Sequence, residues 1–218
     1  MKSSAKKRSM FLVLYFAVYI IAGIPMVLNQ PYGNPPDEHM RFPIPLYIAQ
    51  TLRIPTGFEE ELLIPSYGFS YASRPILPYM FQALWVKIVS FFSDSADHLL
   101  YAARFANLFL GLIMAYVVLK LAEQWFLDKR FSALFACMVT FLPQALFMHT
   151  YVNTDSCCLL STAVILYAIQ RGTKDDFSVK SCVLLAAGII LCAMSYYNAY
   201  GYLLYAFFLF TALRKLMR

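Results

Sequence analysis

The stretch RPILPYMFQALWVKIVSFFS, residues 74–93, decides how this chain is arranged. As a helix it would be about 30 Å long, which is enough to cross the hydrocarbon core of a bilayer. However, it also carries Arg74, Lys87 and two prolines, and charged side chains are costly inside lipid. The stretch can cross the membrane, or it can lie on the membrane surface as an interfacial helix. The two arrangements place every later loop of the chain on opposite sides of the membrane.

The composition makes lipid the expected surroundings of this protein. Of its 218 residues, 61% are hydrophobic and only 14% are charged, and a soluble domain of this length could not bury so much apolar surface. A net charge of +6 would suit a nucleic-acid partner, but the basic residues form short clusters between apolar segments. Clusters of this kind set the orientation of a membrane protein. We therefore expect an all-α, polytopic integral membrane protein with membrane lipids and no nucleic acid among its partners.

The apolar runs predict about six transmembrane helices, which form a single module over residues 1–218. The predicted spans are 10–28, 99–126, 131–149, 157–170, 180–196 and 199–213. The first is long for a signal peptide and lacks a small-residue cleavage pattern, so we expect a retained signal anchor. Residues 29–98 form an outer loop rich in Pro, Tyr and acids, where we expect juxtamembrane helices.

The distribution of basic residues indicates that 74–93 lies on the surface. With six spans, twelve basic residues fall on one side, and the positive-inside rule makes that side cytoplasmic. They are Lys2, Lys6, Lys7, Arg8, Lys129, Arg130, Arg171, Lys174, Lys180, Arg214, Lys215 and Arg218. If 74–93 spanned the membrane, eight of these would move outside. We therefore expect both termini in the cytoplasm and the loop 29–98 on the outer face of the plasma (inner) membrane.

Polar residues gather on that outer face. Asp37 and Glu38 follow Asn34-Pro-Pro and could simply start a surface helix, with Asn34 as its cap. Arg74 begins the interfacial segment, and Asp155 lies at the outer mouth between two spans, where a lone acid usually has a partner. If Asp37, Arg74 and Asp155 meet in one pocket, an acid that takes a proton beside an arginine that holds a phosphate would make a transferase site.

The ordered set of segments resembles the C-type membrane glycosyltransferases (GT-C fold). These segments are PPDEHMRFPIPLYIAQTLRIPT, then SRPILPYMFQALW, LDKR and FLPQALFMHTYVNTDS. The similarity covers about residues 10–200 and points to the branch of lipid A aminoarabinose transferases, protein O-mannosyltransferases and related uncharacterised bacterial membrane proteins. Asp37 and Glu38 match that family's acid pair, Arg74 its phosphate contact and Asp155 its second acid.

The resemblance implies inverting transfer of a sugar from a polyprenyl-phosphate donor to an acceptor on the outer face. Asp37, with Glu38 beside it, would act as the general base or orient the acceptor. Arg74 would stabilise the charge on the departing phosphate. A divalent cation, Mn²⁺ or Mg²⁺, is compatible with Asp37 and Asp155, but we expect no obligatory metal. Relatives of this kind continue with further spans, so we also expect a missing C-terminal part or a partner protein.

Several other residues allow two interpretations. His39 could contact the donor phosphate or be a solvated histidine, and His149 could line the pocket or reach the membrane interface. The tyrosines at 196–202 form an interfacial belt or face the sugar. Arg104, inside a predicted span, needs a partner, for which Asp97 and Asp155 are candidates.

Two interpretations without catalysis stay open beside the enzyme. One is a transporter-like or scaffold subunit, and the other is an inactive, truncated remnant of a GT-C enzyme. A transporter typically places charged residues near the middle of its spans. Here the predicted spans are nearly uncharged at their centres and the carboxylates gather outside, a distribution that favours chemistry at the membrane surface.

Overall fold

The described part of the chain is helical, as its sequence predicts. The computed structural model describes residues 2–66 and 68–216. Within these ranges there is no β-strand, and one isolated antiparallel bridge joins Ile64 and Phe69. The α-helices are α1 (Lys2–Asn29), α2 (Glu38–Arg41), α3 (Pro43–Thr51), α4 (Leu77–Ser90), α5 (Ala96–Trp125), α6 (Lys129–Thr140), α7 (Pro143–Met148), α8 (Asp155–Gly172), α9 (Val179–Ala193) and α10 (Gly201–Leu216). Short 3-10 helices occur at Glu60–Leu62, Tyr71–Ser73 and Tyr197–Ala199.

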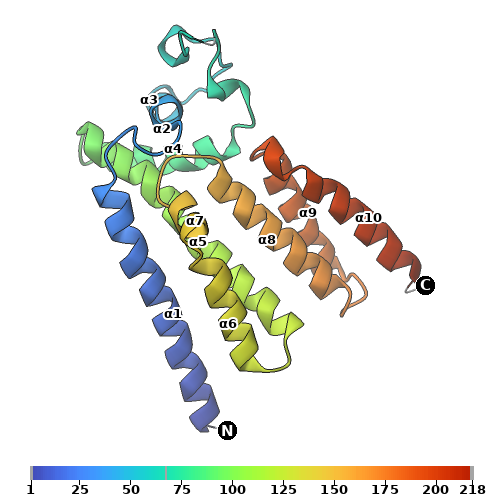
Figure 1. Ribbon diagram of the computed structural model, residues 1–218. Coiled ribbons are helices and arrows are strands. Elements are labelled where there is room, and N and C mark those ends of the chain that lie inside the picture. The colour runs from blue at the N-terminus through green and yellow to red at the C-terminus, as the bar shows by residue number, and fades with distance from the viewer. Residues whose placement is uncertain (1, 67, 217–218) are drawn as a thin grey trace.

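Helix α5 is the centre of the molecule. Figure 1 shows the long helices as one bundle, with α2, α3 and α4 gathered across one end of it. Helix α5 packs against α1, α4, α6 and α8. Its contact surface includes fully buried small residues such as Ala103, Ala106 and Ala115, and small side chains let helix backbones approach closely. The chain enters α1 and leaves α10 at the bundle end away from α2–α4 (Figure 1).

Two of the described helices have the length and hydropathy of a membrane span. They are residues Arg8–Asn29 of α1 and the whole of α5, Ala96–Trp125. The predicted third span, 131–149, is instead two helices, α6 and α7. Pro143 opens α7 and Leu142 before it is extended (φ −56°, ψ 123°), because proline has no N–H and disfavours a helical residue in front of it. The count of about six spans thus stays a prediction beyond α1 and α5.

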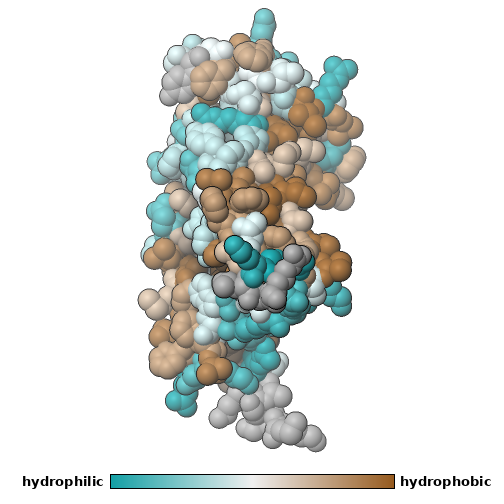
Figure 2. Space-filling view, turned by 90° about the vertical axis from the view of Figure 1, so that its right-hand side faces the viewer, coloured by the Kyte–Doolittle hydropathy of each residue, from teal (hydrophilic) through white to brown (hydrophobic). Residues whose placement is uncertain are grey.

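Large apolar side chains cover much of the outer surface of the bundle. Val13 and Ile21 on α1, Val183 on α9, and Phe207 and Phe208 on α10 are all more than 60% exposed. Figure 2 shows patches of hydrophobic residues across the face on the side of α9 and α10. Such a surface is costly in water and ordinary in lipid, which agrees with a membrane protein.

The segment 74–93 forms the short helix α4. Its 14 residues correspond to about 21 Å, less than the roughly 30 Å of hydrocarbon that a span must cross. Helix α4 packs against α3 and α5, and it lies across the end of the bundle in Figure 1. Tyr79, Ala83 and Val86 form its buried side. This geometry agrees with an interfacial helix.

The loop that carries the acid pair differs in one detail from the surface helix that its sequence allowed. Asn34 does not cap a helix, because α2 begins at Glu38 with Asp37 at the N-cap position. After Phe42 the next helix, α3, begins at Pro43. The reason is that proline at the first helical position has the φ that a helix needs and lacks only an N–H that would be unpaired.

Candidate functional site

A cluster of two arginines, two carboxylates and four tyrosines lies where α2, α4, α8 and two of the 3-10 helices converge. We call it the Arg41–Arg74 cluster. Its members are Asp37, Arg41, Tyr71, Arg74, Tyr79, Asp155, Tyr196 and Tyr197. The sequence allowed Asp37, Arg74 and Asp155 to meet, and the structure places all three here. It stands at the α2–α4 end of the bundle.

Asp37 is held partly open to solvent by an unusual backbone. Its φ of 58° and ψ of 6° are left-handed, a conformation that Asp tolerates better than most residues. The carboxylate accepts a hydrogen bond from the Tyr71 hydroxyl at 3.1 Å and lies 3.7 Å from an Arg41 guanidinium nitrogen. Its side chain keeps 39% of its exposure. Asp37 therefore has oxygen surface left for a substrate.

Arg74 is positioned by tyrosines on both sides. Pro75 follows it, and its backbone is extended (φ −99°, ψ 175°), as expected before proline. One guanidinium nitrogen donates hydrogen bonds to the hydroxyls of Tyr196 and Tyr197, each at 2.9 Å. The guanidinium also lies 4.6 Å from the centre of the Tyr71 ring, within the range of a cation–π contact.

Arg41 is a member of the cluster that sequence reasoning missed. It is the residue that pairs with Asp37, and its guanidinium is 4.7 Å from the centre of the same Tyr71 ring. It donates hydrogen bonds to Tyr79 at 3.3 Å and Thr154 at 3.1 Å, while its Nε is buried without a partner. A basic residue four positions after Asp37 is the signal that identifies it, because i and i+4 share a helix face.

Asp155 is the half-buried acid of the cluster. It is the first residue of α8 and lies two positions before the predicted span 157–170. Burial raises the pKa of its carboxyl above the ordinary value, against the opposing effect of the Arg41 charge, and the nearby Asp37 raises it further. An acid whose charged form is disfavoured, beside an arginine, is a common feature of functional sites.

Glu38 is buried in an ion pair and cannot act as the second catalytic acid that we expected. It is fully buried, and its two carboxylate oxygens pair with Nε and Nη2 of Arg104 at 2.9 and 2.6 Å. Oε1 also accepts a hydrogen bond from the backbone N–H of Val152 at 2.9 Å. Glu38 is thus the partner of Arg104, where the sequence suggested Asp97 or Asp155. No oxygen of Glu38 is accessible to a substrate.

The two histidines that were candidate substrate contacts, His39 and His149, lie away from the described contacts of the cluster. His149 is fully buried between helices, where its ring contacts the Ser156 hydroxyl at 2.6 Å and the Met114 sulfur at 3.4 Å. It therefore neither lines an open pocket nor reaches the interface. His39 is exposed, and its backbone carbonyl accepts a hydrogen bond from Tyr32.

The cluster offers an anion the half-buried Arg74 guanidinium and phenol hydroxyls, and the buried Arg41 adds a second positive charge beside them. Guanidinium groups bind phosphate well because their planar N–H fork matches its oxygens. In the described ranges no three His, Cys, Asp or Glu side chains come together as a metal-ligand group. The arrangement can bind a phosphate and place it beside the accessible carboxylate of Asp37.

Comparison with known proteins gives one result. A family model described as "Predicted membrane protein (DUF2142)" matches residues 64–217. No curated protein and no solved structure matches the chain. The matched range includes Arg74, Asp155, Tyr196 and Tyr197 of the cluster and starts after Asp37 and Arg41.

Proposed function

This chain belongs to the family described as Predicted membrane protein (DUF2142), and we propose that it is a glycosyltransferase, or the N-terminal module of one. It would transfer a sugar from a polyprenyl-phosphate donor to an acceptor on the non-cytoplasmic face. The observation that carries the proposal is the arrangement around Tyr71. The guanidinium groups of Arg41 and Arg74 both lie close to its ring, 4.7 and 4.6 Å from the centre, and its hydroxyl donates a hydrogen bond to Asp37.

In this mechanism Arg74 binds the donor phosphate, and the buried Arg41 adds positive charge beside it. The oxygen of the acceptor hydroxyl bonds to the anomeric carbon of the sugar, and Asp37 accepts the proton that this hydroxyl loses. The bond between that carbon and the phosphate oxygen breaks with inversion, and the polyprenyl phosphate leaves with the bonding electrons. The two arginines then stabilise the growing negative charge, which is often the largest single contribution to catalysis.

A lipid-linked donor suits the position of the cluster. It lies at the end of the bundle that α4 crosses (Figure 1), so the isoprenoid tail could stay in lipid while the phosphate reaches the arginines. The topology that goes with this proposal has about six spans, with α2–α4 outside and both termini in the cytoplasm of a plasma membrane. No obligatory metal is part of it, and a further chain segment or partner protein would complete the acceptor site.

The test compares wild type with Arg74→Ala and Asp37→Asn, each purified in detergent. Each protein is incubated with radiolabelled polyprenyl-phosphate sugars, and donor binding and sugar transfer are both measured. We expect Arg74→Ala to weaken donor binding at least about tenfold, because a charge-assisted contact is lost. Asp37→Asn should bind the donor and lose transfer by about 10²-fold or more. Arg53→Ala, which removes an exposed arginine of the same loop, is the matched control and should behave as wild type.

The outcomes separate the alternatives. Donor binding without transfer in wild type would support a module that needs a further segment or a partner. No binding of any donor would overturn the proposal and favour a scaffold, a transporter-like subunit or an inactive remnant. Equal losses in Arg74→Ala and Arg53→Ala would show that the effect is one of net charge and not of the cluster.

A further inference from the structure

A charged cavity lies at the opposite end of the bundle from the Arg41–Arg74 cluster (Figure 1). It has a volume of about 340 Å³, within the usual size of a small-molecule site. Helices α1, α5 and α6 form it, and its lining residues are Arg8, Phe11, Leu119, Glu123, Lys129, Arg130, Ser132 and Ala133. Nothing in the proposed glycosyl transfer uses this cavity.

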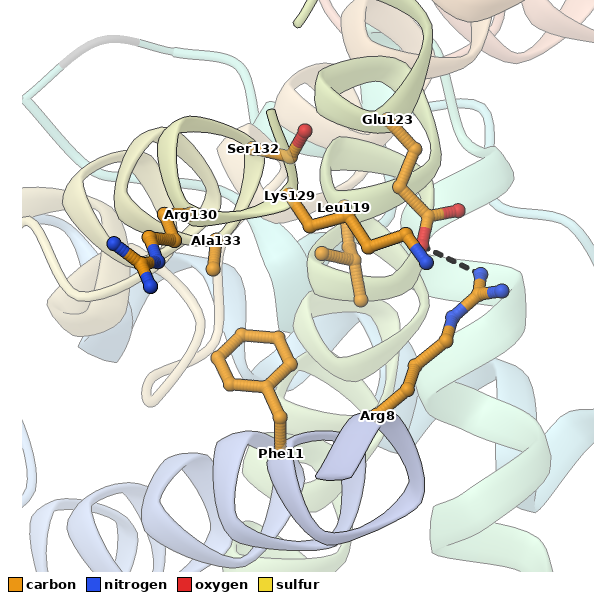
Figure 3. Close-up of a pocket in the computed structure, with 8 residues that line it drawn as sticks. All are labelled: Arg8, Phe11, Leu119, Glu123, Lys129, Arg130, Ser132 and Ala133. Atoms are coloured by element: carbon orange, nitrogen blue, oxygen red, sulfur yellow. Dashed lines mark hydrogen bonds and ion pairs between the residues drawn. The ribbon is translucent and has the colours of Figure 1, made fainter. Parts of the chain in front are cut away.

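The cavity combines an apolar wall with a cationic rim. Figure 3 shows the Phe11 ring pointing into the space between α1 and α6, with Leu119 of α5 behind it. Arg8 and Lys129 converge on one side, and the Arg130 guanidinium lies on the other. Such a site suits a ligand with an anionic group and an apolar body.

The positive charge at this rim is only partly neutralised. Glu123 is the one carboxylate lining the cavity, and it pairs with Arg8 at 2.6 Å and Lys120 at 3.1 Å. Within the described ranges, the side chains of Lys129 and Arg130 have no ion-pair partner. The nearby Asp128 is engaged as the N-cap of α6, where its side chain accepts a hydrogen bond from the backbone N–H of Arg130.

Other polar groups of the cavity do not compete for an anion. The Ser132 hydroxyl donates to backbone carbonyls, those of Ala122, Phe126 and Asp128 lying within 3.3 Å. Its hydrogen is therefore directed to the protein. An anion that enters meets two unpaired cations and the Arg8 of an existing pair.

The surroundings indicate that this anion belongs to a lipid. Exposed apolar side chains flank the cavity on both helices, with Met10 and Leu14 on α1 and Phe131 and Leu134 on α6 each more than half exposed. Trp125, at the end of α5, is also exposed, and it packs edge-on against Phe135; tryptophan is enriched at the membrane–water interface. Acyl chains could therefore lie along α1 and α6 while the headgroup occupies the cavity.

We propose that this cavity binds the phosphate headgroup of an anionic glycerophospholipid. Basic pockets between membrane helices recognise such headgroups by charge. Phe11, Leu119 and Ala133 contact the glycerol and the first methylenes, while Lys129 and Arg130 bind the phosphate. This site does not depend on the glycosyltransferase proposal, because its residues and its end of the bundle are different.

The test measures lipid retention by the purified chain with native mass spectrometry. The probes are phosphatidylglycerol, zwitterionic phosphatidylcholine and inorganic phosphate. Wild type should retain one phosphatidylglycerol and bind phosphatidylcholine about tenfold more weakly. The double variant Lys129→Ala/Arg130→Ala should lose about tenfold in phosphatidylglycerol binding. Lys180→Ala/Lys215→Ala removes the same charge elsewhere on the chain and should bind as wild type.

Two further variants distinguish the site from a general effect of charge or folding. Ala133→Phe fills the cavity without changing the charge and should also weaken phosphatidylglycerol binding. Glu123→Gln removes the competing carboxylate and should strengthen it by about threefold, a gain that misfolding cannot produce. Equal binding of both lipids, equal losses in the two double variants, or displacement by millimolar inorganic phosphate without lipid retention would overturn the proposal.

Discussion

Asp37 and Glu38 are neighbours in the chain, yet the structure gives them opposite environments. The left-handed backbone at Asp37 ends the irregular loop, and α2 begins at the next residue. Asp37 therefore faces the tyrosines and solvent, whereas Glu38 points into the bundle towards Arg104 of α5. The two side chains separate because Asp37 has a left-handed backbone outside the helix, whereas Glu38 is the first residue of α2.

The Glu38–Arg104 pair predicts a large effect of an isosteric change. Glu38→Gln would leave the fully buried Arg104 guanidinium without a counter-charge, and breaking a buried pair from one side costs about 3–5 kcal/mol. We expect a lower free energy of unfolding and a lower Tm in thermal unfolding of the detergent-solubilised protein. The exposed Glu60→Gln is the control and should be neutral. A Tm equal to that of wild type in Glu38→Gln would contradict this account.

Replacing Asp155 should raise the stability of the protein, in contrast to Glu38→Gln, and the gain should depend on pH. Burial, the largest cause, raises its pKa in the folded protein above the unfolded value, so its ionised form is disfavoured by folding. Stability from this group is complete below the unfolded pKa, about 3.9, and is lost as the pH rises through the higher folded pKa. Asp155→Asn should therefore be more stable than wild type at pH 7.

The measurement is the Tm of both proteins between pH 4 and pH 8. The advantage of Asp155→Asn should shrink as the pH falls, because the carboxyl of the folded wild type then takes up a proton and no longer carries a disfavoured charge. A difference that does not vary with pH would show that the amide acts through packing and not through charge.

The contact between α1 and α5 depends on a position without a side chain. A Cβ at Gly111 of α5 would meet the Tyr19 hydroxyl of α1 and the His149 ring, both of which belong to fully buried residues. The glycine therefore sets how closely the first helix, α7 and the central helix pack. Residues at such close approaches tolerate little added volume.

Gly111→Ala should accordingly destabilise the bundle. Overpacking of a well-packed core typically costs about 1–3 kcal/mol, so we expect a lower Tm. Gly201→Ala is the matched control, because a Cβ at Gly201 has no heavy atom within 4 Å. Equal Tm values for the two variants would show that α1 can move away from α5 without cost.

The bundle has two distinct ends, so its orientation in the membrane can be tested. Helices α2–α4 lie across one end, and the chain enters and leaves at the other (Figure 1). Helix α4 is too short to span, and the proposed six crossings would put both termini on one side. The basic clusters predict that this side is the cytoplasm.

Reporter fusions check this orientation. A fluorescent protein fused to either terminus should fluoresce in the cytoplasm, and alkaline phosphatase inserted between α4 and α5 should be active outside. If 74–93 spanned the membrane, the C-terminal fusion would instead lie outside. That outcome would leave Arg8 inside and place Arg130 and the C-terminus outside, and it would contradict the proposed topology.

Composition and pattern alone were sufficient for the helical class and the two long apolar helices. These properties depend on the hydropathy and spacing of neighbouring residues, which the chain carries locally. The same patterns placed Asp37, Arg74 and Asp155 on one face, because loops between helices of one bundle end must lie near each other.

The sequence pattern could not show which charged residues contact each other. From it we expected Glu38 to be a catalytic acid and Asp97 or Asp155 to be the partner of Arg104, and we assigned no role to Arg41. The structure pairs Glu38 with Arg104 and stacks Arg41 on Tyr71. The residues of the first contact are 66 positions apart in the chain, and those of the second are 30 apart. Only the packing of the helices decides which charges share a low-dielectric site and therefore pair.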